Sequence, residues 1–88
     1  MIKVRKLKYL GGYRMRFWFS DDSTGELDFS KIVAEPGPMI EPLRDNGFFA
    51  QAFLEFGAPT WPNGYDISPG ALFQEMKDAA LLQREVVA

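Results

Sequence analysis

The 88-residue sequence contains no cysteine and no histidine. Without cysteine the chain has no disulfide, no thiolate nucleophile and no zinc-finger site. Without histidine it lacks the usual general base and the most common metal ligand. A Ser-His-Asp catalytic triad is therefore excluded. These absences argue against several classes of enzyme, and we expect no catalytic residues, no metal and no cofactor.

Long apolar runs are also missing, since the longest, residues 79–82, has only four residues. A membrane-spanning helix needs about 20 apolar residues, and the apolar part of a signal peptide needs about 7–15. We therefore expect a protein without a membrane segment that stays in the cytoplasm. The absence of cysteine fits this compartment.

The chain does contain enough apolar residues for a core. They make up 47% of it, aromatics make up 15%, and 10 basic and 12 acidic side chains give a net charge of −2. This composition is that of a folded globular protein rather than a disordered chain. The length predicts one α+β domain, which we place at residues 1–80. Residues 81–88 are then the end of a C-terminal helix or a frayed tail.

The N-terminal third has the pattern of β-strands. Large apolar or aromatic side chains at positions 13, 15, 17 and 19 alternate with Arg14, Arg16 and Trp18. This is the period of a strand with one buried face. Before it, the phase of the alternation slips near Arg5 and Lys6, which predicts a β-bulge or bend at that point.

Two turn signals divide this region into three strands. Gly11-Gly12 is the first, and the polar residues 20–25 are the second. We predict an antiparallel meander from residue 2 to about residue 29. In the predicted register Phe17 faces Leu27, so that apolar side chains meet on one face and charged side chains on the other.

Beyond the meander, residues 51–56 and 60–61 predict a fourth and a fifth strand. Ser68-Pro69 then has the residues of a helix start, with serine as the cap and proline in the first turn. An apolar stripe at helical spacing follows, and the helix is expected to reach about Arg84. The predicted fold class is α+β: an antiparallel sheet of four to five strands, with an N-terminal three-stranded meander and a C-terminal helix packed on it.

Several of these segments occur in an order that resembles a known family. The shared features include the aromatic-rich meander, a leucine-arginine-aspartate turn in residues 42–45, and a Trp-Pro-Asn-Gly segment at residues 61–64. Matching residues also include Phe49, Asp66, Pro69, Leu72 and Phe73. On these residues, up to about residue 75, the chain resembles the bacterial family of domain of unknown function 2442. The resemblance implies a compact α+β domain without an established activity, and an antitoxin-like role as the partner of a small toxin-like protein.

Positive charge is concentrated at the N-terminus. Residues 1–16 hold six basic and no acidic side chains, whereas residues 17–88 hold four basic and all twelve acidic ones. Such asymmetry is found at nucleic-acid-binding surfaces, and Trp18 would suit stacking on a single strand. We favour the alternative that Arg14 and Arg16 pair across the sheet with acidic residues such as Glu26 and Asp28.

We interpret the Trp-Pro-Asn-Gly segment and its neighbours as structural rather than as a ligand pocket. A tryptophan in the core, a proline at a strand end, an Asn-Gly turn and an aspartate at a helix start are all common structural devices. The residues of this motif are Trp61, Pro62, Asn63, Gly64, Asp66 and Pro69.

Apolar residues at the C-terminus lie beyond the stripe of the predicted helix. They are Leu81, Leu82, Val86 and Val87. A small domain rarely leaves such residues bare unless they meet a partner. Contact with another protein or a second copy of the chain, and a frayed end, remain open alternatives.

The predicted function is a non-enzymatic protein-binding module, antitoxin-like, that uses Arg14, Arg16 and Trp18 or the tail residues Leu81 and Leu82. Its partner would be a small toxin-like protein or a second copy, as a homodimer. One alternative is a nucleic-acid-binding protein that uses the basic N-terminal strands. Another is a small-ligand-binding protein with a pocket lined by Asp66 or Glu26.

Overall fold

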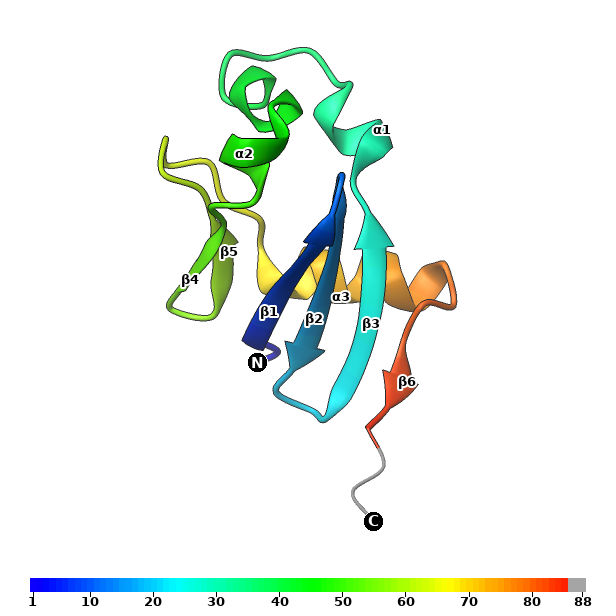
Figure 1. Cartoon of the computed structure of the whole chain (residues 1–88). Coiled ribbons are helices and arrows are strands. Elements are labelled where there is room, and N and C mark those ends of the chain that lie inside the picture. Colours follow the sequence, from blue (N-terminus) through cyan, green and yellow to red (C-terminus); the bar gives the residue numbers. More distant parts are fainter. Residues whose placement is uncertain (86–88) are drawn as a thin grey trace.

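The computed structural model of the chain describes residues 1–85 (Figure 1). Its main sheet contains the predicted meander, in which β1 (Val4–Gly11), β2 (Arg14–Phe19) and β3 (Ser23–Asp28) run antiparallel. A two-residue strand, β6 (Gln83–Arg84), pairs with β3 and completes the order β1-β2-β3-β6. The predicted bulge is confirmed, because the pairing of β1 with β2 shifts between Val4 and Lys6.

The register of the second hairpin differs from the prediction. Phe17 pairs with Gly25 rather than with Leu27, two residues further along β3. The prediction was wrong because it assigned too many residues to the turn, whereas the loop consists of residues 20–22 only. Asp22 closes this loop with a φ of 70°, and its N–H donates to the last carbonyl of β2 at 3.1 Å. A shift of two residues keeps every side chain on its predicted face.

Short elements occupy the middle of the chain. They are α1 (Ser30–Val33), the 3-10 helix η1 (Glu41–Arg44) and α2 (Asn46–Phe49). Strands β4 (Phe53–Glu55) and β5 (Ala58–Thr60) follow, close to the predicted fourth and fifth strands. They pair with each other in a separate two-stranded sheet and do not extend the meander.

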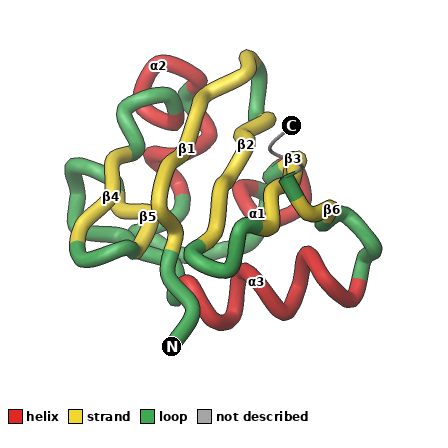
Figure 2. Tube along the Cα trace, turned by 90° about the horizontal axis from the view of Figure 1, so that it is seen from below, coloured by secondary structure: helices red, strands yellow, loops and turns green. Residues whose placement is uncertain are grey.

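Helix α3 (Pro69–Asp78) covers one face of the main sheet (Figures 1 and 2). Its start agrees with the prediction, since Ser68 is the cap and its hydroxyl accepts the Ala71 N–H at 3.4 Å. Leu72 and Met76 point into the core, at the spacing of one helical turn.

The prediction that this helix reaches Arg84 was wrong. Ala80 takes a left-handed conformation with a φ of 57°, and its N–H donates to the Lys77 carbonyl at 3.0 Å. The Leu81 N–H donates to the Met76 carbonyl at 2.9 Å. These two bonds form a Schellman motif, which ends a helix by satisfying its last carbonyls. The chain then turns back to the sheet as β6.

The core lies between the main sheet, α3 and the segment that carries β4, β5 and Trp61. The α+β fold class is therefore as predicted. Leu7, Tyr13, Leu54 and Phe73 are partly buried and pack against the margin of this core. The buried apolar residues are Val4, Met15, Phe17, Phe19, Leu27, Phe29, Val33, Leu43, Phe49, Trp61, Leu72 and Met76.

Candidate binding surfaces

The face of the main sheet that points away from α3 carries the basic residues of the meander. Because Met15, Phe17 and Phe19 point into the core, the residues that alternate with them point outward. We call this surface the outer face. It consists of Lys6, Lys8, Arg14, Arg16, Trp18, Glu26 and Asp28.

Part of the charge on the outer face is paired within the protein. Glu26 accepts hydrogen bonds from Arg14 at 2.9 Å and from Arg16 at 3.1 Å, as ion pairs. These two bonds lower the pKa of the Glu26 carboxyl below its ordinary value. The Lys6 ammonium lies 4.7 Å from the centre of the Trp18 ring, in a cation–π contact. The expected pairing of the two arginines across the sheet is confirmed for Glu26.

The motif around Trp61 forms part of the core and a tight turn. Trp61 is fully buried, and its indole Nε1 donates to the Phe49 carbonyl at 2.9 Å. Asn63 and Gly64 form the turn, and Gly64 has a φ of 89°. The Gly64 N–H donates a hydrogen bond to the Trp61 carbonyl at 2.9 Å. Asp66 forms a backbone bridge with Thr60, and its side chain is exposed.

Of the predicted tail residues, Leu82 packs against the core and Leu81 is 39% exposed. Leu82 thus has a structural contact within the chain. Val86 and Val87, the other two apolar residues of the predicted tail contact, lie outside the described residues.

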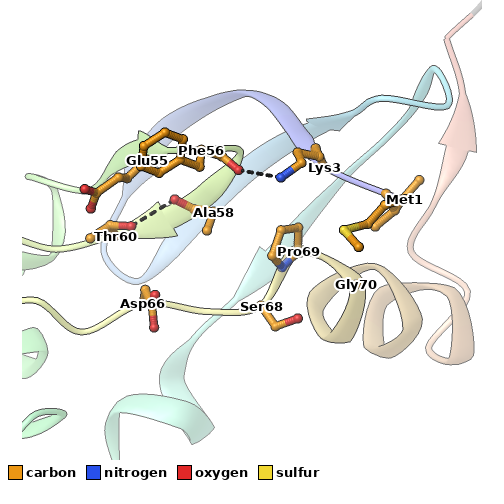
Figure 3. A pocket seen from close by; sticks show the side chains of 11 residues that line it. Met1, Lys3, Glu55, Phe56, Ala58, Thr60, Asp66, Ser68, Pro69 and Gly70 are labelled. Atoms are coloured by element: carbon orange, nitrogen blue, oxygen red, sulfur yellow. Dashed lines mark hydrogen bonds between the residues drawn. The ribbon is translucent and has the colours of Figure 1, made fainter.

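A hollow of about 510 Å³ lies between the β4–β5 hairpin and the start of α3 (Figure 3). We call it the hairpin hollow. Glu55, Phe56 and Ala58 line one side of it, and Ser68 and Pro69 line another. Asp66 and residues 1–3 are also part of the wall.

The loop of this hairpin contains a residue with an unusual conformation that the sequence pattern did not predict. Phe56 has a φ of 51° and a side chain that is 88% exposed. With Gly57, whose φ is 79°, it forms the two-residue loop between β4 and β5. Such loops favour Asn-Gly or Gly-Gly, because both positions need a positive φ. The prediction placed Phe56 at the end of a strand, so its conformation was not foreseen.

The loop is held firmly against the first strand. The Lys3 ammonium donates to the Phe56 carbonyl at 3.0 Å, and Figure 3 shows this bond beside the hollow. The Val4 N–H donates to the Gly57 carbonyl at 2.9 Å. A β-carbon at Gly57 would lie only 2.6 Å from the Lys3 side chain, so the two chain segments pack closely.

A second hollow, of about 690 Å³, lies along the outer edge of β3. We call it the edge hollow. Its apolar lining consists of Leu27, Ile32 and Leu81, while Lys31 and Glu75 are among its charged residues.

Several kinds of site are not found among residues 1–85. No cluster of three or more Asp or Glu side chains there is placed to hold a metal ion. Every buried side-chain nitrogen or oxygen atom in this part of the chain has a hydrogen-bond partner. None of the helices formed by these residues is long and apolar enough to cross a membrane.

A family model described as a protein of unknown function, DUF2442, matches residues 4–78. The chain belongs to the DUF2442 family. No curated protein and no solved structure gives a significant match to it. The family resemblance inferred from the sequence is therefore confirmed, and its description assigns no activity.

In this DUF2442 protein the leucine-arginine-aspartate turn ties the middle of the chain to the meander. Arg44 donates from Nε to the Val33 carbonyl at 2.7 Å and from Nη2 to the Glu35 carbonyl at 2.9 Å. The Tyr13 hydroxyl of the meander donates to the Arg44 carbonyl. Asp45 caps α2 by accepting a backbone N–H at 2.9 Å. The side chains of Arg44 and Asp45 therefore stabilise the fold through hydrogen bonds within the chain.

Proposed function

We propose that this protein is a non-enzymatic protein-binding module, and that Phe56 is the main anchor for its partner. The single observation that supports this proposal is the left-handed conformation of a phenylalanine whose side chain is 88% exposed. A bulky residue with a positive φ is a genuine outlier, and such outliers cluster at functional sites.

Phe56 is unfavourable for the isolated chain in two ways. A left-handed conformation costs about 1–2 kcal/mol for a residue with a β-carbon, and glycine avoids this cost. The exposed ring also forgoes the stabilisation that burial of an aromatic side chain provides. With 88% of the side chain exposed, little burial within the chain offsets these disadvantages, so a contact with another molecule is the better explanation.

The structure around Phe56 suits an anchor. Bonds from Lys3 and Val4 to the loop carbonyls hold the backbone in place, so the loop itself needs little ordering on binding. Phe53 of β4 is a second exposed aromatic residue in the same hairpin, at 45% exposure. Aromatic side chains are enriched at protein interfaces, where a few buried anchors supply most of the affinity.

The proposed partner is a protein with an apolar pocket that receives the Phe56 ring. The family resemblance inferred from the sequence adds a more specific proposal, an antitoxin-like pairing with a small toxin-like protein of the same bacterial cell. A second copy of the chain is the alternative partner. The absence of histidine and cysteine supports a role without catalysis.

The test compares tagged wild-type protein with Phe56→Gly by affinity purification from the native cell under mild lysis. Size-exclusion light scattering then gives the stoichiometry of what elutes. We expect a second small protein in fixed ratio with the wild type, and at least a tenfold loss of it with Phe56→Gly, as for a central anchor.

Two controls make this result specific to Phe56. Met39→Ala removes another exposed apolar side chain, at 44% exposure, and is expected to retain the partner. Thermal unfolding is expected to show that Phe56→Gly is at least as stable as wild type. Equal recovery of partner with Phe56→Gly and wild type, or no partner in fixed ratio at all, would contradict the proposal.

Nucleic-acid binding by the outer face is less well supported. Its two arginines both pair with Glu26, and Lys6 already contacts Trp18. If the outer face did bind nucleic acid, its affinity for single-stranded DNA would fall steeply with rising salt. We expect only weak binding at low salt. The small-ligand alternative also lacks support, since Asp66 and Glu26 line open hollows rather than deep pockets.

A further inference from the structure

The outer edge of β3 is only partly covered by another strand. β6 pairs with Ser23 and Thr24 and reaches no further along β3. The last three residues of the strand, Glu26, Leu27 and Asp28, therefore form a sheet edge that no strand within residues 1–85 covers.

The register shows which backbone groups point out of this edge. The Phe29 N–H donates to the Tyr13 carbonyl at 2.8 Å, at the end of the β2–β3 ladder. In an antiparallel pair, hydrogen-bonded positions alternate with non-bonded ones. Leu27 therefore bonds to β2, while the N–H and C=O groups of Glu26 and Asp28 point outward. No backbone bond of these two residues to another element is found within residues 1–85.

The path of the chain from α3 explains why β6 covers no more of β3. The chain returns from α3 through Leu81, whose carbonyl oxygen approaches Gly25 closely. The segment before Leu81 belongs to the end of α3, so it leaves the sheet at that point. The edge beyond Gly25 is thus left open by the path of the chain.

The edge hollow lies beside these outward groups. Leu27 forms part of its apolar lining, together with Ile32 of α1 and Leu81. A strand added beside β3 would alternate its side chains between this hollow and the outer face. One set of side chains would therefore contact apolar residues, and the other set would lie beside Glu26 and Asp28.

The charge of the open edge distinguishes between two possible added strands, one from a second copy of this chain and one from another protein. Both outward-facing side chains of the open edge, Glu26 and Asp28, are acidic. Antiparallel pairing of this edge with a second copy would place acidic side chains opposite each other, which is destabilising. A segment with lysine or arginine opposite Asp28 would instead form a cross-strand ion pair, while Glu26 keeps its bonds to Arg14 and Arg16.

We propose that the open edge of β3 accepts an extended segment of another protein, in which basic and apolar residues alternate, as an added strand. Its backbone bonds to Glu26 and Asp28, its apolar side chains enter the edge hollow, and a basic side chain pairs with the Asp28 carboxylate. Strand addition of this kind obtains affinity from the backbone and specificity from alternate side chains. The site is separate from Phe56 and does not depend on its role.

The experiment uses the full chain, ¹⁵N-labelled, and a synthetic peptide, acetyl-Lys-Val-Lys-Leu-Lys-Val-amide. Amide hydrogen exchange and chemical shifts are followed by NMR. We expect the Glu26 and Asp28 amides to exchange readily in the free protein and at least tenfold more slowly with saturating peptide. A matched peptide in which alternate amides are N-methylated lacks those backbone donors. It is expected to leave the exchange of the Glu26 and Asp28 amides unchanged. A scrambled peptide of the same composition tests for attraction by charge alone.

Two variants locate the binding site. Leu81→Lys places a positive charge at the edge hollow and is expected to abolish protection by the peptide, while Met39→Lys, a matched change elsewhere, is expected to retain it. Phe56→Gly is expected to bind the peptide as wild type does, so failure here and failure of the Phe56 proposal are distinguishable. Slow exchange of Glu26 and Asp28 without peptide would overturn the proposal, as would equal effects of the scrambled or N-methylated peptide.

Discussion

Gly25 of β3 lies directly against the backbone carbonyl of Leu81. A β-carbon at Gly25 would be 2.2 Å from that oxygen and 3.0 Å from the Met76 side chain. Leu81 belongs to the turn that leads from α3 back to the sheet, so the two segments meet at a position without a side chain. This contact determines where the C-terminal segment joins β3 and where it leaves the edge open.

Gly25→Ala is therefore expected to destabilise the protein by about 3 kcal/mol, because the new methyl group meets backbone that has little freedom to move. Urea unfolding at neutral pH measures this change. Gly70→Ala is the matched control, since its new β-carbon would have its nearest neighbour at 3.9 Å. Stability close to that of wild type is expected for the control. Equal effects of the two substitutions on stability would show that the Leu81 carbonyl does not prevent a side chain at position 25.

Ala80→Gly is expected to stabilise the protein. Ala80 has a φ of 57° after the end of α3, where glycine is the preferred residue. Relief of the left-handed strain should contribute about 1 kcal/mol, which corresponds to a rise in Tm of about 4–8 °C for a domain of this size. Ala79→Gly serves as the control, since Ala79 has a φ of −87° and gains nothing from the change. An unchanged or lower Tm for Ala80→Gly would contradict the Schellman assignment.

Arg44→Lys is expected to destabilise the protein by about 1–2 kcal/mol although the charge is retained. The guanidinium group reaches two carbonyls, those of Val33 and Glu35, and a lysine ammonium lacks this forked geometry. Chemical unfolding measures the loss, with Arg84→Lys in β6 as the control. Arg84 makes no side-chain hydrogen bond within residues 1–85, so its substitution should change little. If both variants unfold alike, the two bonds of Arg44 contribute nothing measurable.

The ion pairs of Glu26 predict a pH dependence of stability. Hydrogen bonds from Arg14 and Arg16 lower the pKa of Glu26 in the folded state below its ordinary value of 4.5. A lowered folded-state pKa gives stabilisation that is present above the unfolded pKa and is lost as the pH falls through the folded one. Wild type should therefore be more stable than Glu26→Gln at pH 7, and the difference should shrink steadily below about pH 4.5.

Urea unfolding of both proteins at pH 7, 5 and 3 tests this expectation. Added salt should also narrow the difference at pH 7, because the pairs are partly exposed. A difference between the two proteins that stays constant from pH 7 to pH 3 would show that the charge of Glu26 is not responsible.

Local patterns in the sequence were sufficient to predict the meander, its faces, the bulge near Arg5 and the start of α3. Each of these features depends on side chains close together along the chain: alternation selects the strand faces, and Ser68-Pro69 selects the helix start. The family was also recognisable, because its matching segments span most of the chain. The conformation of Phe56, the proposed anchor, was not predicted, and Phe-Gly between two short apolar runs was the available signal.

The sequence by itself thus determined the α+β class and the outward-facing charges, because two-residue and helical periodicity act locally. The tertiary structure alone decided the end of α3, the pairing of Gln83–Arg84 with β3, and the separation of β4 and β5 from the meander. These features depend on contacts between distant residues, such as Gly25 with Leu81 and Lys3 with Phe56. No local pattern encodes such contacts, and they place both the strained Phe56 and the open edge of β3 at the surface.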